Sequence, residues 1–273
     1  GAERGSEGSA RVHRPMTFRK HEKFPSSILK NERDLIVYLP PGYEEQPERR
    51  FPVLYLQDGQ NLFDGATSFV PGMDWRVGQT ADHMIGIGAV EPLIIVGIYN
   101  LGKHRIREYT PSRMPKLGGG SGNRYGKFLV EEVKPFIDQE YRTLGDAGNT
   151  GLGGSSLGGL VSLYVGLKYA DIYGKVAALS PSVWWNQRVM HRFAATVRVG
   201  RRPRIWLDIG TAEGQQIVGD VENFHDVLLQ KGWQPERDLH FESVEGAEHN
   251  EGAWAARVGH VLQFLFPASH SDV

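Results

Sequence analysis

Two serines in a glycine-rich stretch are the residues of this chain whose type and spacing best fit covalent catalysis. Residues 150–159 read TGLGGSSLGG, with a short apolar run before them and a long apolar run after them. Centred on Ser156, the stretch fits the pattern Gly-x-Ser-x-Gly through Gly154 and Gly158. Centred on Ser155, it does not. Small residues on both sides of a serine suit a sharp strand-to-helix turn, so we predict Ser156 as a nucleophile. An ordinary turn could have the same composition, and the interpretation therefore depends on a partner base and acid.

Two later residues supply that base and acid. A serine hydroxyl needs an adjacent base to take its proton and a third group to orient the base. His249 follows the last predicted strand, whereas the other nine histidines lie in tails, helices, a strand or a rim loop. We predict His249 as the base. Glu213, in a glycine-flanked loop after the preceding strand, is the predicted acid. Asp208, within that strand, and Asp220, at the start of the next helix, remain alternatives.

Backbone N–H groups must stabilise the oxyanion of an acyl-transfer intermediate. Loss of one such donor raises a reaction barrier by about 3–4 kcal/mol. The N–H of Leu157, directly after the predicted nucleophile, is one candidate, because the start of a helix favours an anion. The other is the N–H of Gln60, in a loop after a buried strand, where Gly59 lets the backbone approach closely.

The elements that position these residues alternate between strand and helix. Together with the strand that enters the serine stretch, the apolar patterns predict strands at 16–24, 34–39, 51–57, 92–99, 175–179, 204–209 and 239–244. Between them we predict helices at 75–87 and 125–141, after Ser156, within 187–203, from 217, and up to Pro267. This alternation is typical of one α/β domain with a mainly parallel sheet. We expect that domain to cover residues 16–267, between tails at 1–15 and 268–273.

Composition limits the classes of function. The 273 residues carry a net charge of −1 and no cysteine, which excludes disulfides, cysteine-bound zinc and a thiol nucleophile. The balance of charge gives no reason to expect nucleic acid or an anionic membrane as partner. No run is long enough for a membrane span. The chain shows no apolar signal-peptide core, which favours the cytoplasm over a processed secreted form. We expect neither a metal nor another cofactor.

Aromatic and cationic residues near the predicted site could bind substrate. The segment 100–125 is long and contains Arg105, Arg107 and Tyr109. Such loops in a domain are usually functional or mobile, and we expect its glycine run to be mobile. Trp184 and Trp185 directly follow a strand and suit either core packing or a pocket wall. We predict Trp184, Trp185, Tyr109 and Arg107 as substrate-binding residues.

Five short motifs together resemble the esterase D family of α/β-hydrolases, over roughly residues 30–267. They are Asp58-Gly59-Gln60-Asn61, Arg107-Glu108-Tyr109-Thr110-Pro111, Gly153-Gly154-Ser155-Ser156-Leu157-Gly158-Gly159, Gly210-Thr211-Ala212-Glu213 and Glu248-His249-Asn250. The chain order of serine, acid and histidine is also that of α/β-hydrolases. The family includes feruloyl and acetyl-xylan carbohydrate esterases and enterochelin-esterase-like enzymes. The resemblance implies an α/β-hydrolase fold, Ser156, Glu213 and His249 as triad, and Gln60 and Leu157 as oxyanion donors. The short segment between Ser180 and Arg204 leaves little room for a large lid, so we expect an open cleft.

The sequence therefore predicts a serine esterase that acts through an acyl-enzyme on short-acyl or aromatic-acyl esters, including carbohydrate-linked ones. Two alternatives share the same triad: an esterase for a siderophore trilactone, and an acyltransferase. A third alternative is a non-catalytic binding protein with the hydrolase fold. The pattern does not name the natural ester, which is a small molecule or a carbohydrate, and leaves the oligomeric state open.

Overall fold

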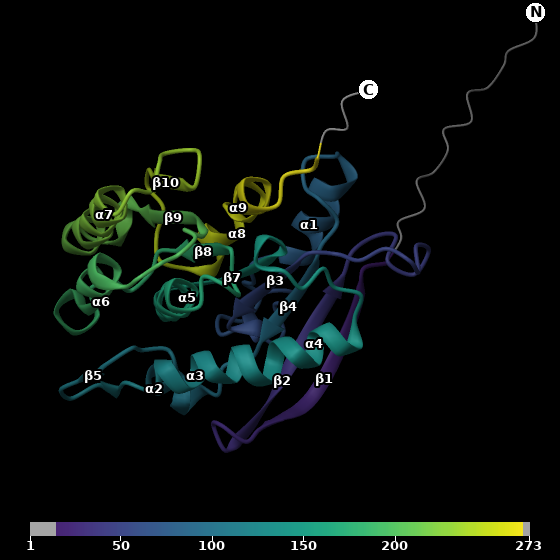
Figure 1. The fold of residues 1–273 in the computed structure, drawn as a ribbon, viewed down its shortest axis with the longest axis horizontal. Coiled ribbons are helices and arrows are strands. Elements are labelled where there is room, and N and C mark those ends of the chain that lie inside the picture. Colours follow the sequence, from purple (N-terminus) through teal and green to yellow (C-terminus); the bar gives the residue numbers. More distant parts are fainter. Residues whose placement is uncertain (1–14, 270–273) are drawn as a thin grey trace, which may run out of the picture.

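An eight-stranded β-sheet runs through the computed structural model of the protein, which describes residues 15–269 (Figure 1). The strand order is β1-β2-β4-β3-β7-β8-β9-β10. β2 pairs antiparallel with both β1 and β4, and every other pairing is parallel. A mainly parallel sheet led by antiparallel strands is therefore confirmed. The strands are β1 Thr17–Ser26, β2 Asn31–Leu39, β3 Val53–Gln57, β4 Ile94–Ile98, β7 Thr150–Ser155, β8 Lys175–Leu179, β9 Arg204–Gly210 and β10 Leu239–Val244.

Helices cover both faces of the sheet (Figure 1). On β3, Val53 and Tyr55 belong to one buried apolar cluster and Leu54 and Leu56 to another, as the two-residue period of a strand requires. The first cluster includes residues of α3 Gly122–Phe128, α4 Lys134–Glu140, α5 Leu157–Lys168, α6 Trp185–Thr196 and α7 Gln215–Gln230. The second includes residues of α1 Val77–Gly86, α8 Glu251–Ala255 and α9 Val258–Leu265. In the segment between β8 and β9, α6 is the one helix, and no large lid is inserted there.

The segment between β4 and α3 is more ordered than the sequence predicts. It forms a 3₁₀ turn η2 Gly102–His104, the short helix α2 Arg105–Glu108 and a two-stranded sheet of β5 Arg113–Met114 and β6 Gly118–Gly119. Gly119 has φ 96°, and a Cβ there would lie 2.3 Å from Oγ1 of Thr110. That hydroxyl also accepts a hydrogen bond from the N–H of Gly120 at 2.9 Å. The glycines thus let the chain pack closely in a hairpin, and the expectation of an irregular segment is wrong. The mobility of the glycine run stays a prediction.

The helix predicted over 125–141 is interrupted, as its proline suggests. A π-helical turn, η3 Leu129–Val133, separates α3 from α4, and Pro135 stands at the second position of α4. Proline has no N–H and its ring clashes with the preceding turn, so regular α-helical bonding cannot continue through it.

Two other sequence-based expectations concern the ends of the chain and membranes. Most of the predicted tails, 1–15 and 268–273, lies outside the described residues. Within residues 15–269, no helix has the length and apolar character needed to cross a membrane.

A buried ion pair fixes α2 against the sheet. Nη2 of Arg33, on β2, lies 2.8 and 3.0 Å from the two carboxylate oxygens of Glu108, on α2. The two side chains are 0% and 4% exposed. Nδ2 of Asn31 also donates to Glu108 at 3.1 Å. The pair therefore ties the segment after β4 to the antiparallel side of the sheet.

We predict that Glu108→Ala lowers the free energy of unfolding by about 3–5 kcal/mol, because it leaves the Arg33 guanidinium buried without its counter-charge. Urea unfolding followed by circular dichroism measures the loss. Glu222→Ala, an exposed position on α7, is the matched control and should change the value by no more than about 0.5 kcal/mol. Equal stabilities of the two variants would contradict the prediction.

Candidate active site

Ser156 stands between β7 and α5 with an unusual backbone conformation. Its φ is 59° and its ψ is −125°, which is costly for a residue with a side chain, by about 1–3 kcal/mol. Two hydrogen bonds hold the turn: Ser156 N–H donates to the carbonyl of Leu179 at 3.1 Å, and Ser182 N–H donates to the carbonyl of Ser156 at 3.0 Å. Leu179 is the last residue of the neighbouring strand β8 and Ser182 follows that strand, so the sheet itself maintains the conformation.

The glycines that flank this turn are required by close packing. A Cβ on Gly154 would lie 2.8 Å from the carbonyl carbon and oxygen of Gly158. A Cβ on Gly158 would lie 3.1 Å from Cβ of Gln57, on β3. The first turn of α5 therefore packs directly on the strands, and the Ser156 side chain projects at their carboxyl edge.

The structure brings the predicted nucleophile, base and acid together. Oγ of Ser156 lies 3.0 Å from Nε2 of His249, and Nδ1 of His249 lies 2.6 Å from Oε1 of Glu213. The three residues follow β7, β10 and β9 at the edge where the carboxyl ends of parallel strands meet. This chain of contacts has the geometry in which a serine can pass its proton to an oriented imidazole.

The acid-bearing and base-bearing loops are bonded to each other. Ala212 N–H donates to the carbonyl of Ala247 at 3.1 Å, and Gly246 N–H donates to Oγ1 of Thr211 at 2.7 Å. A Cβ on Gly210 would lie 2.2 Å from the carbonyl oxygen of Ala247, so only glycine allows this approach. The two loops therefore hold Glu213 and His249 in a fixed relation.

The helix that follows the base is capped directly after it. The Asn250 side chain accepts a hydrogen bond from Ala253 N–H at 2.9 Å and begins α8. His249 is thus the residue directly before the N-cap of α8. Its ring also meets the edge of Trp254, with the centroids 4.9 Å apart and the planes at 85°.

The Glu213 carboxylate is buried and hydrogen-bonded through both of its oxygens. Its side chain is 1% exposed, and its second oxygen accepts hydrogen bonds from Oγ of Ser180 at 2.6 Å and from Gly210 N–H at 2.7 Å. Burial pushes the pKa of Glu213 upward, but the hydrogen bonds from His249, Ser180 and Gly210 outweigh it and hold this pKa below its ordinary value. The carboxylate is therefore ionised at neutral pH.

The neighbours of Ser180 determine where its hydroxyl proton points. It accepts hydrogen bonds from Nε1 of Trp254 at 3.2 Å and from Nη1 of Arg257 at 3.1 Å. Indole and guanidinium groups can only donate. The single hydroxyl proton of Ser180 must therefore point to Glu213. Ser180 itself is 2% exposed.

The two alternative acids have other partners. Asp208 is fully buried and accepts hydrogen bonds from Arg257 Nη1, Trp206 Nε1 and Ser180 N–H at 2.8, 2.8 and 2.9 Å. Burial raises the pKa of Asp208 to about 6, against the opposing effect of Arg257. Asp220 lies 2.7 Å from Nε of Arg188. Among the described residues, Glu213 is the carboxylate that contacts the His249 ring.

Both predicted oxyanion donors stand at the first turn of a helical segment, where N–H groups have no intrahelical partner. Leu157 is the first residue of the twelve-residue helix α5. Gln60 is the second residue of a 3₁₀ turn, η1 Gly59–Asn61. The Gln60 side chain is engaged elsewhere, because it exchanges two hydrogen bonds, of 3.1 and 3.0 Å, with the backbone of Asn100. Its backbone N–H is the group that can take part.

A cavity of about 470 Å³ opens in front of Ser156 and His249. Phe69, Val70 and Trp254 supply apolar lining, and Asn61, Asn100 and Arg105 supply polar lining. Arg105 is held by Asp58 through two bonds of 2.9 Å, from Nε and Nη2. The cavity therefore combines an apolar wall with a fixed guanidinium, a common composition for small-molecule sites.

The structure does not place the four predicted substrate-binding residues in the lining of this cavity. Tyr109 is fully buried, and its hydroxyl accepts a hydrogen bond from Asp58 N–H at 3.2 Å. Trp185 is 1% exposed, with Nε1 donating to the carbonyl of Ser112 at 2.9 Å. Trp184 is half-buried and packs on Trp185, and Arg107 is exposed. The two tryptophans follow the core-packing alternative instead of forming the predicted wall.

Sequence reasoning missed other residues that surround the site. Phe69 is 83% exposed and stands beside Val70 in the segment between β3 and α1. Its position after a parallel strand, where α/β sheets place ligand-binding groups, could have identified it. Ser180 follows β8 at the same sheet edge as Ser156, which was a positional signal. For Arg257 there was no local signal, because its role depends on contacts with distant parts of the chain.

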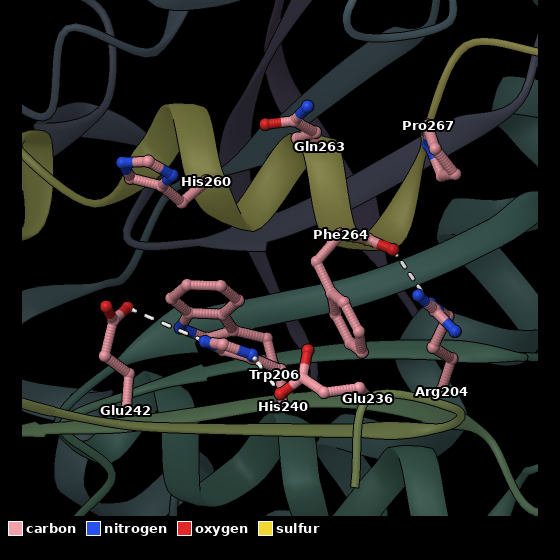
Figure 2. Close-up of a pocket in the computed structure, with 9 residues that line it drawn as sticks. All are labelled: Arg204, Trp206, Glu236, His240, Glu242, His260, Gln263, Phe264 and Pro267. Atoms are coloured by element: carbon pink, nitrogen blue, oxygen red, sulfur yellow. Dashed lines mark hydrogen bonds and ion pairs between the residues drawn. The ribbon is translucent and has the colours of Figure 1, made fainter.

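A second cavity, of about 340 Å³, has a different character (Figure 2). Its central residue, His240, stacks on Trp206 with the ring centroids 4.5 Å apart. The His240 ring nitrogens face Glu236 at 2.8 Å and Glu242 at 3.8 Å. No hydroxyl nucleophile lines this cavity, in contrast to the cavity in front of Ser156. In the part of the chain that the structure describes, no group of three or more His, Asp or Glu side chains could hold a metal ion.

The mainly parallel sheet, the helices on both faces and the serine turn define an α/β-hydrolase. A family model described as "Putative esterase" matches residues 26–264, and the chain belongs to this family. The predicted family resemblance is thereby confirmed, and the protein is a carboxylic ester hydrolase.

Three curated relatives illustrate the range of the similarity. "Uncharacterized protein YbbA" of Bacillus subtilis is 26% identical over 88% of this chain and 95% of its own length. "Iron(III) salmochelin esterase" of Escherichia coli O6:H1 is 28% identical over 75% of this chain and 48% of its own. "Endo-1,4-beta-xylanase/feruloyl esterase" of Xylanibacter ruminicola is 28% identical over 56% of this chain and 20% of its own.

Solved structures share the fold. The BES protein of Bacillus cereus is 22% identical, with a TM-score of 0.73 over 95% of this chain and 99% of that one. The enterobactin esterase FES of Shigella flexneri is 20% identical, with a TM-score of 0.71 over 93% of this chain and 59% of that one.

We predict that Ser180→Ala lowers kcat/KM about 10- to 100-fold, mainly through kcat, because Glu213 and with it His249 are less firmly oriented. Loss of one hydrogen bond also raises the pKa of Glu213 toward its ordinary value. Glu213 then becomes protonated at a higher pH, so the acid limb of the pH–rate profile should move to higher pH.

The comparison is with Ser162→Ala, a buried serine of α5 that does not contact Glu213. That variant should retain the original profile. An unshifted acid limb in Ser180→Ala would show that the hydroxyl has only a packing role.

Proposed function

We propose that this protein is a serine esterase that works through an acyl-enzyme. The observation that carries the proposal is the unbroken set of contacts from Ser156 through His249 to Glu213. In this proposal Ser156 is the nucleophile, His249 the base and Glu213 the group that orients and balances the imidazolium. The strained backbone of Ser156 supports it, since such strain is typical of a serine presented at an elbow.

In the acylation half-reaction, Nε2 of His249 takes the proton as Oγ of Ser156 attacks the ester carbonyl. The carbonyl oxygen becomes an oxyanion and accepts hydrogen bonds from the N–H groups of Leu157 and Gln60. The imidazolium keeps its Nδ1 proton and donates it in a hydrogen bond to the Glu213 carboxylate. When the C–O bond breaks, Nε2 returns a proton to the leaving alcohol, and the acyl group remains on Ser156.

A water molecule then hydrolyses the acyl-enzyme. Nε2 of His249 takes a proton from a water molecule as the water attacks the acyl carbonyl. The second oxyanion is stabilised by the same two N–H groups. Collapse releases the carboxylic acid and returns the proton to Oγ of Ser156.

We infer that the substrate is a short-acyl or aromatic-acyl ester, a carbohydrate-linked one included. The apolar lining by Phe69, Val70 and Trp254 suits an aryl or short alkyl group. The similarity to a xylanase/feruloyl esterase supports an aromatic acyl group. Asn61, Asn100 and Arg105 offer hydrogen bonds to a polar leaving group.

A second candidate substrate is a siderophore trilactone. The similarity to a salmochelin esterase favours it. Transfer of the acyl group to an alcohol is a variant of the same mechanism, with the acceptor in place of water. A substrate panel of feruloyl esters, acetylated sugars, p-nitrophenyl esters of increasing acyl length and a trilactone distinguishes the hydrolytic candidates by kcat/KM. An added alcohol acceptor reveals transfer product if transfer competes with hydrolysis.

We predict that Ser156→Ala lowers the turnover of p-nitrophenyl acetate by more than about 10³-fold, because no acyl-enzyme can form. The variant should also fail to react with a fluorophosphonate probe, whereas the native protein should be labelled at Ser156. Circular dichroism of the variant should match that of the native protein.

Ser162→Ala, on helix α5 directly after Ser156, is the matched control and should keep both turnover and labelling. Native turnover by Ser156→Ala would rule out the assigned nucleophile. A folded native protein that neither reacts with the probe nor hydrolyses any ester of the panel would favour the non-catalytic binding protein.

A further inference from the structure

Positive charge is concentrated in one segment of a nearly neutral chain. The protein has a net charge of −1, but residues 100–130 contain seven lysines and arginines and a single acidic residue, Glu108. That segment includes η2, α2 and α3, beside the cavity of Ser156. Such an asymmetry creates a local field that attracts anions.

A separate cavity of about 250 Å³ lies within this positive region. Three cationic side chains line it, Lys30, Arg107 and Arg124, together with His104. They come from the β1–β2 turn, from α2 and from α3, so three distant parts of the chain converge on one hollow. The cavity lining contains one acidic residue, Glu108.

Within residues 15–269, the three cations of this cavity form no ion pair with a carboxylate. The Glu108 carboxylate is already neutralised by buried Arg33. The nearby Glu132 accepts its hydrogen bonds from Ser26, Ser27 and Ile28. Within residues 15–269, the side chains of Lys30 and Arg107 have no hydrogen-bond or ion-pair partner, and Arg124 donates to a backbone carbonyl, that of Ile28.

This cationic cavity and the cavity of Ser156 share a wall. Gly102 and Arg105 line the Ser156 cavity, whereas His104 and Arg107 line the cationic one. All four belong to the continuous segment formed by η2 and α2. A helical segment with its side chains is about 10–12 Å across, so one extended molecule could occupy both cavities.

We propose that the cationic cavity lined by Lys30, Arg107 and Arg124 is a subsite for an anionic group, a carboxylate in the simplest case, carried by the ester substrate away from its scissile bond. This inference rests on the proposed esterase function and narrows it to esters with a remote negative charge. Guanidinium groups suit a carboxylate because they can bind it with two parallel hydrogen bonds. The surrounding positive segment would raise the rate of encounter with such esters.

The test compares p-nitrophenyl half-esters of dicarboxylic acids, from four to ten carbons, with p-nitrophenyl esters of neutral acids of the same length. The leaving group and the acyl length are thereby matched, and only the terminal charge differs. We expect kcat/KM of the charged ester to exceed that of its neutral partner by at least about fivefold at the length that reaches the cationic cavity. The advantage should shrink as ionic strength rises, because salt screens exposed charges.

The double variant Lys30→Glu/Arg107→Glu should bring the charged-to-neutral ratio down to about one or below. Arg201→Glu is the matched control: this exposed residue precedes β9, at the opposite edge of the sheet from Ser156, and should leave the ratio as it is. Thermal unfolding of both variants verifies that they fold.

The anion subsite and the esterase function can be refuted separately. If the native protein hydrolyses neutral esters but shows no preference for a charged partner at any length, the anion subsite is overturned and the esterase proposal stands. The same holds if the double variant and Arg201→Glu change the ratio equally. If no ester is hydrolysed and the fluorophosphonate probe does not label Ser156, the proposed function fails, and the subsite with it.

Discussion

The strained, positive-φ conformation of Ser156 is the constraint on which the arrangement of the site depends. It requires a strand that ends abruptly, a helix that starts at the next residue and two glycines where the backbones nearly touch. The cost of the conformation, about 1–3 kcal/mol, is offset because hydrogen bonds with Leu179, the last residue of β8, and with Ser182 hold the backbone in place. His249 has to meet the Ser156 side chain where this turn presents it, and Glu213 has to reach His249.

Three arginine–carboxylate pairs, two of them buried and one half-buried, connect that edge to the rest of the molecule. Arg33 with Glu108 joins β2 to α2, and Arg105 with Asp58 joins α2 to the loop after β3. Arg257 with Asp208 joins the region of α8 and α9 to β9. Each pair is isolated from water on at least one side, where a planar guanidinium that fits a carboxylate is better suited than a lysine. The loops that line the cavity are thus held by electrostatic contacts in addition to apolar packing, such as that of Leu62 and Tyr109.

The order of elements could be predicted from the sequence because each strand and helix shows its own period of apolar residues. The contact of His249 with Ser156 and Glu213 followed from a rule of topology, that loops after parallel strands converge. The same rule alone could not predict which residues line the cavity. Trp184 and Trp185 have the same local pattern whether they face a cavity or the core, and the Ser112 carbonyl that binds Trp185 lies more than 70 residues away in the chain. Ser180 and Arg257 were missed for the same reason, since their roles are set by partners that no local pattern identifies.

The saturated hydroxyl of Ser180 has one more consequence, for the movement of protons. Its lone pairs are occupied by Trp254 and Arg257, and its only proton is committed to Glu213. A hydroxyl in this state cannot act as a link in a Grotthuss-type relay, because it has no free position at which to receive a proton. The interior side of the Glu213 carboxylate is therefore closed to proton exchange through Ser180. Glu213 therefore acts as a fixed negative charge next to Nδ1 of His249. The proton that moves during turnover is confined to Nε2, the side of the ring that faces Ser156.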